Sequence, residues 1–197
     1  MPEAFFARDA RIVARALLGT YLVRVDRDVV RAGRVVETEA YRGPTDAACH
    51  ARFGLTKRTR TLLGAPARAY VYVIYGMYDC FNVVCLAEGR GHAVLVRAVE
   101  PVLGIDADAR TDGPGRLTRA LGISRAHDGA DLVRGGAIYL TEAGRRPRSV
   151  GVSARVGVGY AGAHADLPLR FVDTSSAHVS RPPAKSVGRG VSVRGRG

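Results

Sequence analysis

One run of the chain, residues 69–85, constrains the fold more than any other feature. It reads AYVYVIYGMYDCFNVVC and is rich in the β-branched and aromatic residues that strands favour. Gly76 lies near its middle and permits a tight reversal of the backbone. The run therefore predicts a β-hairpin that presents Tyr75, Met77 and Tyr78 at its tip.

A single amphipathic helix is predicted over residues 10–18. Apolar residues recur there at helical spacing. Asp9 can cap the start of the helix, and Gly19 supplies a stop. We therefore expect one face of this helix to be buried.

Most of the other elements are predicted as short strands. Pro101 is expected to end one of them, and two short helices are expected after it, at 103–110 and 115–121. Because antiparallel-looking strands outnumber crossover helices, we expect an α+β fold. It would be a single domain with a curved, mostly antiparallel β-sheet, short peripheral helices and the protruding hairpin. The expected strands cover residues 21–25, 33–41, 93–99, 136–141, 152–158 and 168–172.

The charge balance points to a polyanionic partner. The chain has 30 Lys and Arg against 18 Asp and Glu, a formal net charge of +12. Residues 181–197 hold five basic and no acidic residues, so 25 basic against 18 acidic residues, an excess of +7, remain in residues 1–180. We expect residues 1–180 to form the domain and residues 181–197, rich in Pro, Gly, Ser and Arg, to be a basic disordered tail. Nucleic acid is the favoured partner class.

Several sequence features indicate a cytoplasmic protein. The longest uncharged apolar stretch is far below the roughly 18 residues that a membrane span needs. Residues 1–19 alternate charged and apolar side chains, unlike a signal peptide. The three cysteines, Cys49, Cys80 and Cys85, show no zinc-binding spacing and are expected to be reduced thiols.

Glu39 is a candidate for proton transfer. Period two on the expected strand places Glu37, Glu39 and Tyr41 on one face. A carboxylate held against an apolar wall has a raised pKa that suits acid-base chemistry. The alternative is that both glutamates are solvated on an exposed strand face.

Tyrosines and a histidine form a second candidate group. Tyr41, His50, Tyr72, Tyr75 and Tyr78 concentrate in one region of a basic chain. Aromatic faces stack on nucleobases and can enclose a cationic base, and an exposed aromatic at a hairpin tip can wedge between bases. The alternative is an ordinary sheet core in which tyrosine is simply a good strand former.

Two polar side chains on apolar strands need buried partners. Arg97 lies within the run AVLVRAV and must pair with a carboxylate or a phosphate, for which Glu39 and Glu100 are the candidates. Asn82 lies on the neighbouring strand and also needs a hydrogen-bonding partner. A structural salt bridge is the default interpretation of Arg97.

These segments together resemble one family. RVVETEAY at 34–41, DAACH at 46–50, YVYVIYGMY at 70–78 with Asn82, and LVRAVEP at 95–101 occur in the order found in the alkyladenine (3-methyladenine) DNA glycosylases, the class without a helix-hairpin-helix. Shorter matches extend the likeness over roughly residues 4–180. Agreement of several ordered motifs is more specific than any single motif.

The resemblance implies a base-excision-repair enzyme. Such an enzyme flips an alkylated or deaminated purine out of duplex DNA and hydrolyses its N-glycosidic bond, leaving an abasic site. It needs an enclosing pocket, an ordered water and a base, and no metal or cofactor is implied. Its partner would be double-stranded DNA containing damaged purines, and a monomer is expected.

The resemblance also implies roles for individual residues. Glu39 resembles the general base, and Arg97 with the backbone carbonyl of Val156 resembles the groups that hold the attacking water. Tyr75 resembles the residue that intercalates into the DNA. The base-binding residues would be Tyr41, His50 and Tyr72 as walls and Asn82 as the floor that excludes the 2-amino group of guanine. Met77, Tyr78 and Arg58 would contact DNA near the hairpin tip and the backbone.

The chain departs from the family pattern in one segment. Thr56-Lys57-Arg58-Thr59 stands where the family often has Thr-Pro-Arg-Asn, and Ala65-Pro66-Ala67 replaces a Pro-Gly turn. The segment next to the DNA backbone is therefore expected to dock differently. None of the residues assigned to chemistry is lost.

Two other functions compete with this interpretation. A non-catalytic module that binds damaged DNA or another nucleic acid would keep the wedge and the charge, but it gains nothing from a buried Glu39. A lyase that works through an amine is disfavoured because only Lys57 and Lys185 are lysines.

Overall fold

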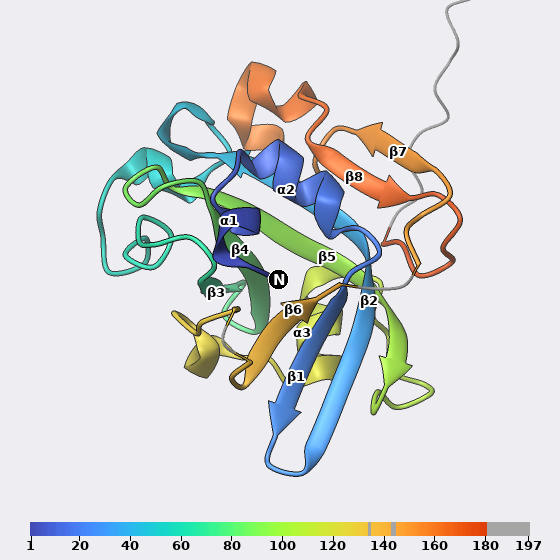
Figure 1. Ribbon diagram of the computed structural model, residues 1–197. Coiled ribbons are helices and arrows are strands. Elements are labelled where there is room, and N and C mark those ends of the chain that lie inside the picture. Colours follow the sequence, from blue (N-terminus) through green and yellow to red (C-terminus); the bar gives the residue numbers. More distant parts are fainter. Residues whose placement is uncertain (134, 143–144, 181–197) are drawn as a thin grey trace, which may run out of the picture.

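The computed structural model describes residues 1–133, 135–142 and 145–180, so the expected basic tail at 181–197 lies outside the described residues. The strands form one curled sheet, and short helices pack around it (Figure 1). The strands are β1 (Tyr21–Asp26), β2 (Val29–Arg42), β3 (Ala69–Ile74), β4 (Tyr78–Cys85), β5 (His92–Leu103), β6 (Ile138–Thr141), β7 (Val150–Ser153) and β8 (Arg170–Asp173). The helices are α1 (Glu3–Phe6), α2 (Ala10–Leu17) and α3 (Pro114–Leu121).

The sheet is organised around β2. The strand order is β3-β4-β5-β2-β1-β6, and β8 pairs both with β2 and with β7. Every strand pair is antiparallel. The expected α+β fold, with its curved antiparallel sheet and short helices, is confirmed.

Irregular pairing between β2 and β5 helps to place the candidate site. The register shifts between Val35 and Glu37 and again between Glu37 and Thr38. A bulge bends a strand, increases its twist and redirects side chains, as happens often beside active sites. Residues 32–40 of β2 are all buried, so neither face of this part of the strand meets solvent.

Helix α2 covers the sheet as the sequence predicts. Its buried side chains contact the core, and the Thr38 hydroxyl donates to the Ala14 carbonyl at 2.9 Å, which ties α2 to β2. Asp9 caps the helix by accepting from the backbone N–H of Arg11 at 2.9 Å. Gly19 has φ +86°, and a Cβ there would come within 2.7 Å of the Arg145 carbonyl, so glycine is required.

Several expected elements differ from the structure, and β2 begins at Val29 rather than at residue 33. β5 continues through Pro101, where it is still paired with Gly33 of β2 on one edge. On its other edge, β5 pairs with β4 only at residues 92–95, so the N–H that proline lacks is not needed there for pairing with β4. Residues 103–110 form no helix, since Leu103 is still paired with β2 and Gly104 then turns with φ +63°. The strand expected at 152–158 is β7, which ends at Ser153.

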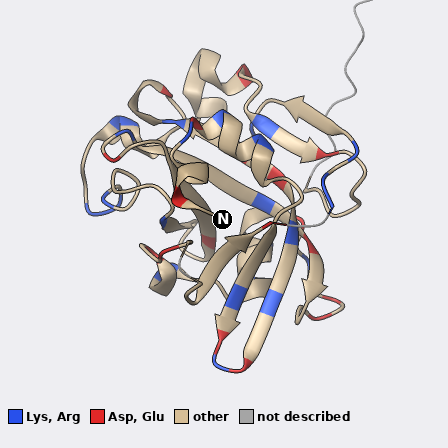
Figure 2. Ribbon diagram, in the orientation of Figure 1, with Lys and Arg blue, Asp and Glu red and all other residues tan. Residues whose placement is uncertain are grey.

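The basic residues are distributed over loops and strands (Figure 2). Several of them point inward: Arg24, Arg34, Arg97, Arg155 and Arg170 are buried. Because these side chains lie inside the protein, they are not available to bind an external polyanion.

The three cysteines lie in the interior of the protein. Cys49, Cys80 and Cys85 are buried and unpaired. Within the described ranges, no helix has the length and apolar character needed to cross a membrane.

Candidate active site

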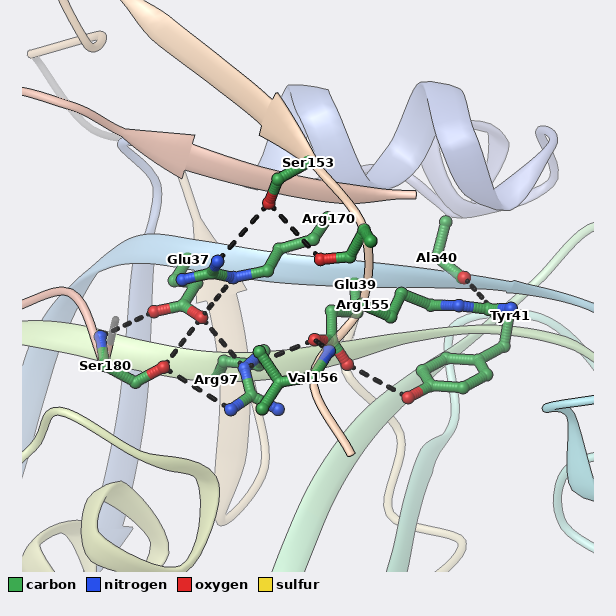
Figure 3. A network of polar contacts seen from close by, with 11 residues as sticks. Glu37, Glu39, Ala40, Tyr41, Arg97, Ser153, Arg155, Val156, Arg170 and Ser180 are labelled. Atoms are coloured by element: carbon green, nitrogen blue, oxygen red, sulfur yellow. Dashed lines mark hydrogen bonds and ion pairs between the residues drawn. The ribbon is translucent and has the colours of Figure 1, made fainter. Parts of the chain in front are cut away.

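Glu39 lies at the centre of a buried polar network on β2 (Figure 3). Its side chain is fully buried, which excludes the solvated alternative. One carboxylate oxygen, Oε1, accepts from the backbone N–H of Val156 at 2.7 Å, and Oε2 accepts from the Tyr41 hydroxyl at 2.9 Å. Arg97 Nε lies 3.4 Å from Oε1. The network therefore brings together all three residues expected to act in chemistry: Glu39, Arg97 and Val156.

The surroundings of Glu39 tune its proton affinity. Burial raises the pKa of the Glu39 carboxyl above its ordinary value, although the Arg97 guanidinium beside it acts in the opposite direction. Burial also raises the pKa of Tyr41 well above its ordinary value, so its hydroxyl keeps the proton that it donates to Glu39. A carboxylate with a raised pKa is a better proton acceptor than an exposed one.

Arg97 has a different principal partner from those expected. Its Nε donates to Glu37 Oε1 at 2.8 Å, whereas Glu100 pairs with Arg34. The expected ion pair with Glu39 is present, but it is the longer of the two. Sequence reasoning missed Glu37, although it stands two residues before Glu39 on the same strand.

The four predicted base-binding residues line one pocket. Its lining includes Tyr41, His50, Tyr72 and Asn82. The His50 and Tyr72 rings meet edge to face, with centroids 4.6 Å apart. Aromatic walls with a few polar groups are typical of sites that bind a flat organic molecule.

Asn82 is held rigidly within this pocket. Its Nδ2 donates to the backbone carbonyls of Tyr70 at 3.1 Å and Cys80 at 3.2 Å. The side chain is almost fully buried. Because both donor bonds go to backbone carbonyls, the orientation of the amide is fixed.

His50 is neutral at physiological pH. Burial lowers its pKa to about 4, and the positive charges of Arg58 and Arg52 add to this effect. Its Nδ1 lies 3.0 Å from the Tyr70 hydroxyl. Because the imidazole is uncharged, it does not repel a cation in the pocket. The neighbouring tyrosine rings attract one, so this part of the pocket favours a cationic ligand.

The lowered pKa of His50 predicts a pH-dependent loss of stability. The unfolded chain, with an ordinary value of 6.5, binds more protons than the folded chain between pH 6.5 and about 4. The free energy of unfolding should therefore fall as pH drops through this window. In urea unfolding at pH 7, 6 and 5, His50→Gln should show a shallower fall than the wild type. Parallel curves would contradict a buried neutral His50.

A buried ion pair supports Tyr41 from behind. Arg155 donates to Asp46 through NH1 at 2.6 Å and NH2 at 2.8 Å, and both side chains are fully buried. The Arg155 guanidinium also lies over the Tyr41 ring, 4.7 Å from its centroid. Neither Arg155 nor Asp46 was expected to have a role. Pairing across 109 residues leaves no local pattern that could reveal it.

The hairpin tip presents all three predicted side chains to solvent. Tyr75 is 85%, Met77 67% and Tyr78 39% exposed. Tyr75 also has φ +52°, a left-handed conformation that is unusual for a bulky residue. Tyr78 is the least exposed of the three because it begins β4 and packs on one side against Gly115 of α3, where a Cβ would lie within 2.8 Å of the ring.

Arg58 lies between the pocket and the solvent. Its guanidinium carbon is 5.1 Å from the centroid of the Tyr72 ring. Lys57, Arg58 and Arg125 line an open groove beside Tyr72. The basic segment that was expected near a DNA backbone thus borders the aromatic pocket.

The described ranges show no group of three or more His, Cys, Asp or Glu side chains that could hold a metal ion.

Comparison with known proteins identifies the family. Residues 4–177 match the family model of the methylpurine-DNA glycosylases. A Myxococcus xanthus protein with 3-methyladenine DNA glycosylase in its name is 52% identical over 184 residues, which are 93% of this chain and 94% of the relative. Similarly named proteins of Anaeromyxobacter dehalogenans and Methanocella arvoryzae are 51% identical over 183 residues (93% of this chain, 86% of the relative) and 44% identical over 192 residues (92% and 96%). The chain belongs to the methylpurine-DNA glycosylase family.

Proposed function

We propose that this protein is a base-excision-repair DNA glycosylase for alkylated or deaminated purines of the 3-methyladenine type. It flips the damaged nucleotide out of duplex DNA and hydrolyses the N-glycosidic bond, leaving an abasic site. Family membership supports the reaction class. The assignment of residues to individual steps rests on the geometry of the polar network and the pocket.

The position of Tyr41 is the observation that carries this proposal. Its ring lines the aromatic pocket, and its hydroxyl donates to the buried Glu39 carboxylate at 2.9 Å. A purine stacked on this ring would therefore have its sugar bond near a proton acceptor. A simple binding module would have no use for a buried carboxylate attached to its pocket wall, since the carboxylate would repel phosphate.

In the proposed reaction, Glu39 takes a proton from the water that attacks C1′ of the flipped nucleotide. The water oxygen forms a bond to C1′ as the N-glycosidic bond breaks, and the bonding electrons leave with the purine. Alkylation at N3 or N7 makes the purine cationic, so the base departs as a neutral molecule. We assign Arg97 and the Val156 carbonyl to holding the water, because the Val156 N–H is already bound to Glu39.

We propose that the pocket selects damaged purines by stacking and exclusion. Tyr41, His50 and Tyr72 supply electron-rich walls with no positive charge on His50, which suits a cationic purine. The fixed amide of Asn82 supports a role as a rigid floor against the 2-amino group of guanine.

Tyr75 is proposed to fill the space that the flipped base vacates. Tyr75→Ser should weaken binding to lesion-containing duplex about 5- to 150-fold, because stacking of an aromatic on bases contributes about 1–3 kcal/mol. Stability should change by less than about 0.5 kcal/mol, since the side chain is exposed. Fluorescence anisotropy and urea unfolding measure the two effects. Tyr75→Phe, which keeps the stacking ring, should bind like the wild type; equal binding by Tyr75→Ser would refute intercalation.

The wider assignments follow from the same proposal. Residues 1–180 would form the glycosylase domain, and Met77, Tyr78 and Arg58 would contact DNA around the tip and the pocket. The protein would act as a monomer on double-stranded DNA in the cytoplasm, associated with the nucleoid when bound. No metal or cofactor takes part in the proposed steps, so base release is expected to persist in EDTA.

A base-release assay tests the proposed function directly. The purified protein is incubated with methylated duplex DNA and with duplexes carrying one ethenoadenine or hypoxanthine, and abasic sites are scored by alkaline cleavage. Release from at least one substrate supports a glycosylase. Binding without release from any of them would favour the nucleic-acid binding module instead. Trapping of a covalent DNA adduct with borohydride would indicate a lyase.

A further inference from the structure

A second carboxylate, Glu37, is buried beside the proposed general base. It is fully buried on β2, and Oε1 accepts from Arg97 Nε, Arg170 Nε and the Ser180 hydroxyl, each at 2.8 Å. Its other oxygen accepts from the Ser180 backbone N–H at 2.6 Å. Four donors from three separate segments therefore converge on one side chain (Figure 3). The mechanism proposed above gives Glu37 no task.

Arg97 is shared unequally between the two carboxylates. Its Nε lies 2.8 Å from Glu37 Oε1 and 3.4 Å from Glu39 Oε1. The short contact is a hydrogen bond to Glu37, while Glu39 receives only the charge of the guanidinium. If Glu37 were neutral, Arg97 would lose its strongest attraction away from Glu39 and keep only neutral acceptors on that side, such as the Ser180 hydroxyl at 3.4 Å. A closer pair would occupy the lone pairs of Glu39 and lower its proton affinity.

Glu37 is the member of the pair that carries the fixed negative charge. The hydrogen bond from Arg170 and the charge of Arg97 outweigh the effect of burial and hold the pKa of Glu37 below its ordinary value. Burial instead raises the pKa of Glu39. Neighbouring carboxylates whose environments separate their proton affinities typically divide their roles in this way.

Ser180 completes the arrangement from the far end of the described chain. It lies 143 residues from Glu37 in sequence and contributes both its N–H and its hydroxyl. Arg97 also donates to the Ser180 hydroxyl, at 3.4 Å. The segment that follows β8 is therefore hydrogen-bonded to Glu37, the carboxylate that also binds Arg97.

We propose that Glu37, clamped by Arg170 and Ser180, is a positioning residue that draws Arg97 onto itself and so keeps Glu39 free to accept a proton. This inference rests on the proposed glycosylase function. It adds Glu37 and Ser180, neither of which touches the pocket, to the set of residues on which the reaction depends.

The test compares Glu37→Gln with the wild type in single-turnover base release from methylated duplex across pH 5–8. The rate should fall about 10- to 100-fold, as expected when a reacting group is misplaced. The rising limb of the pH profile should move about one unit lower, because Glu39 loses the neighbouring negative charge that raises its pKa and Arg97 then pairs more closely with it. Binding to DNA should stay within about threefold of the wild type, since no part of the pocket changes. Glu100→Gln is a matched control on the adjacent strand, paired with Arg34, and should keep the wild-type profile.

Ser180→Ala keeps the test decisive if Glu37→Gln does not fold. It removes the hydroxyl that donates to Glu37 and accepts from Arg97, without changing any charge. Because Arg97 is then held less firmly beside Glu37, the same limb should move in the same direction by a smaller amount, and a lost charge cannot be the cause. A rate that falls with no movement of the limb in either folded variant would overturn the inference and leave Glu37 a purely structural residue. Absence of release by the wild type would instead refute the proposed function itself.

Discussion

Glu39→Gln should abolish most base release while leaving DNA binding intact. The amide oxygen of glutamine can accept from the Val156 N–H, and the amide NH2 group can donate to the Tyr41 hydroxyl, which turns to accept, so the network can survive the substitution. Glutamine cannot take a proton from water. The single-turnover rate on methylated duplex should therefore fall about 10²- to 10⁴-fold, the usual contribution of a general base. Alkaline cleavage of a labelled duplex measures the rate.

The matched control for this variant is Glu3→Gln. Glu3 is exposed in α1, far from the network in sequence, and its neutralisation changes the net charge by the same amount. Affinity of both variants for the lesion duplex should match that of the wild type in fluorescence anisotropy. Wild-type release by a correctly folded Glu39→Gln would show that another group accepts the proton.

The largest loss of stability is expected from Asp46→Ala. Asp46 and Arg155 are joined by two hydrogen bonds and are both fully buried. Removing one partner leaves a buried charge without compensation, which typically costs about 3–5 kcal/mol. Because Arg155 also lies over the Tyr41 ring, the pocket wall should loosen as well. Urea unfolding reports the free energy, and the Michaelis constant for base release should rise.

Two further variants distinguish the effect of breaking the buried ion pair from the effect of removing an aspartate side chain. Asp26→Ala removes a largely exposed aspartate that lies 3.7 Å from Arg24, and it should cost less than about 1 kcal/mol. Adding Arg155→Met to Asp46→Ala should recover part of the loss, since the unpaired charge is then gone. An Asp46→Ala variant as stable as Asp26→Ala would show that the pair contributes little.

The local elements of this fold follow from sequence pattern. The hairpin of β3 and β4 and the buried face of α2 depend on residues close together in the chain, and they form where the pattern predicts. The boundaries that failed depend on distant partners. Pro101 remains in β5 because β2 continues opposite it, and no local rule for proline reveals that pairing.

The sequence pattern indicates which candidate residues lie together on β2, but it does not reveal which ion pairs they form. Alternation along β2 places Glu39 with Tyr41, and their hydrogen bond confirms the shared face. Ion pairs form instead between residues that the fold brings together from far apart. Arg97 therefore meets Glu37 rather than Glu100, and Arg155 meets Asp46.

The number of arginines overstates how many can contact DNA. Among the arginines that the structure describes, five are buried. Arg34, for example, donates to Asp173 at 2.8 Å and also pairs with Glu100. Four acidic side chains, Glu37, Glu39, Asp46 and Asp173, are buried as well, so burial takes particular arginines from the surface but removes little of its net positive charge.

The place of β2 in the sheet also determines which parts of the molecule can move independently. β2 is hydrogen-bonded to β1, β5 and β8, so its amide protons can exchange with solvent only when a large part of the sheet opens. β3 lies at the end of the strand order and ends in the exposed turn at 75–77. Fluctuations of this turn need not disturb the strand that carries Glu39. A displacement of the hairpin tip can therefore be absorbed at the edge of the sheet without moving the buried carboxylates at its centre.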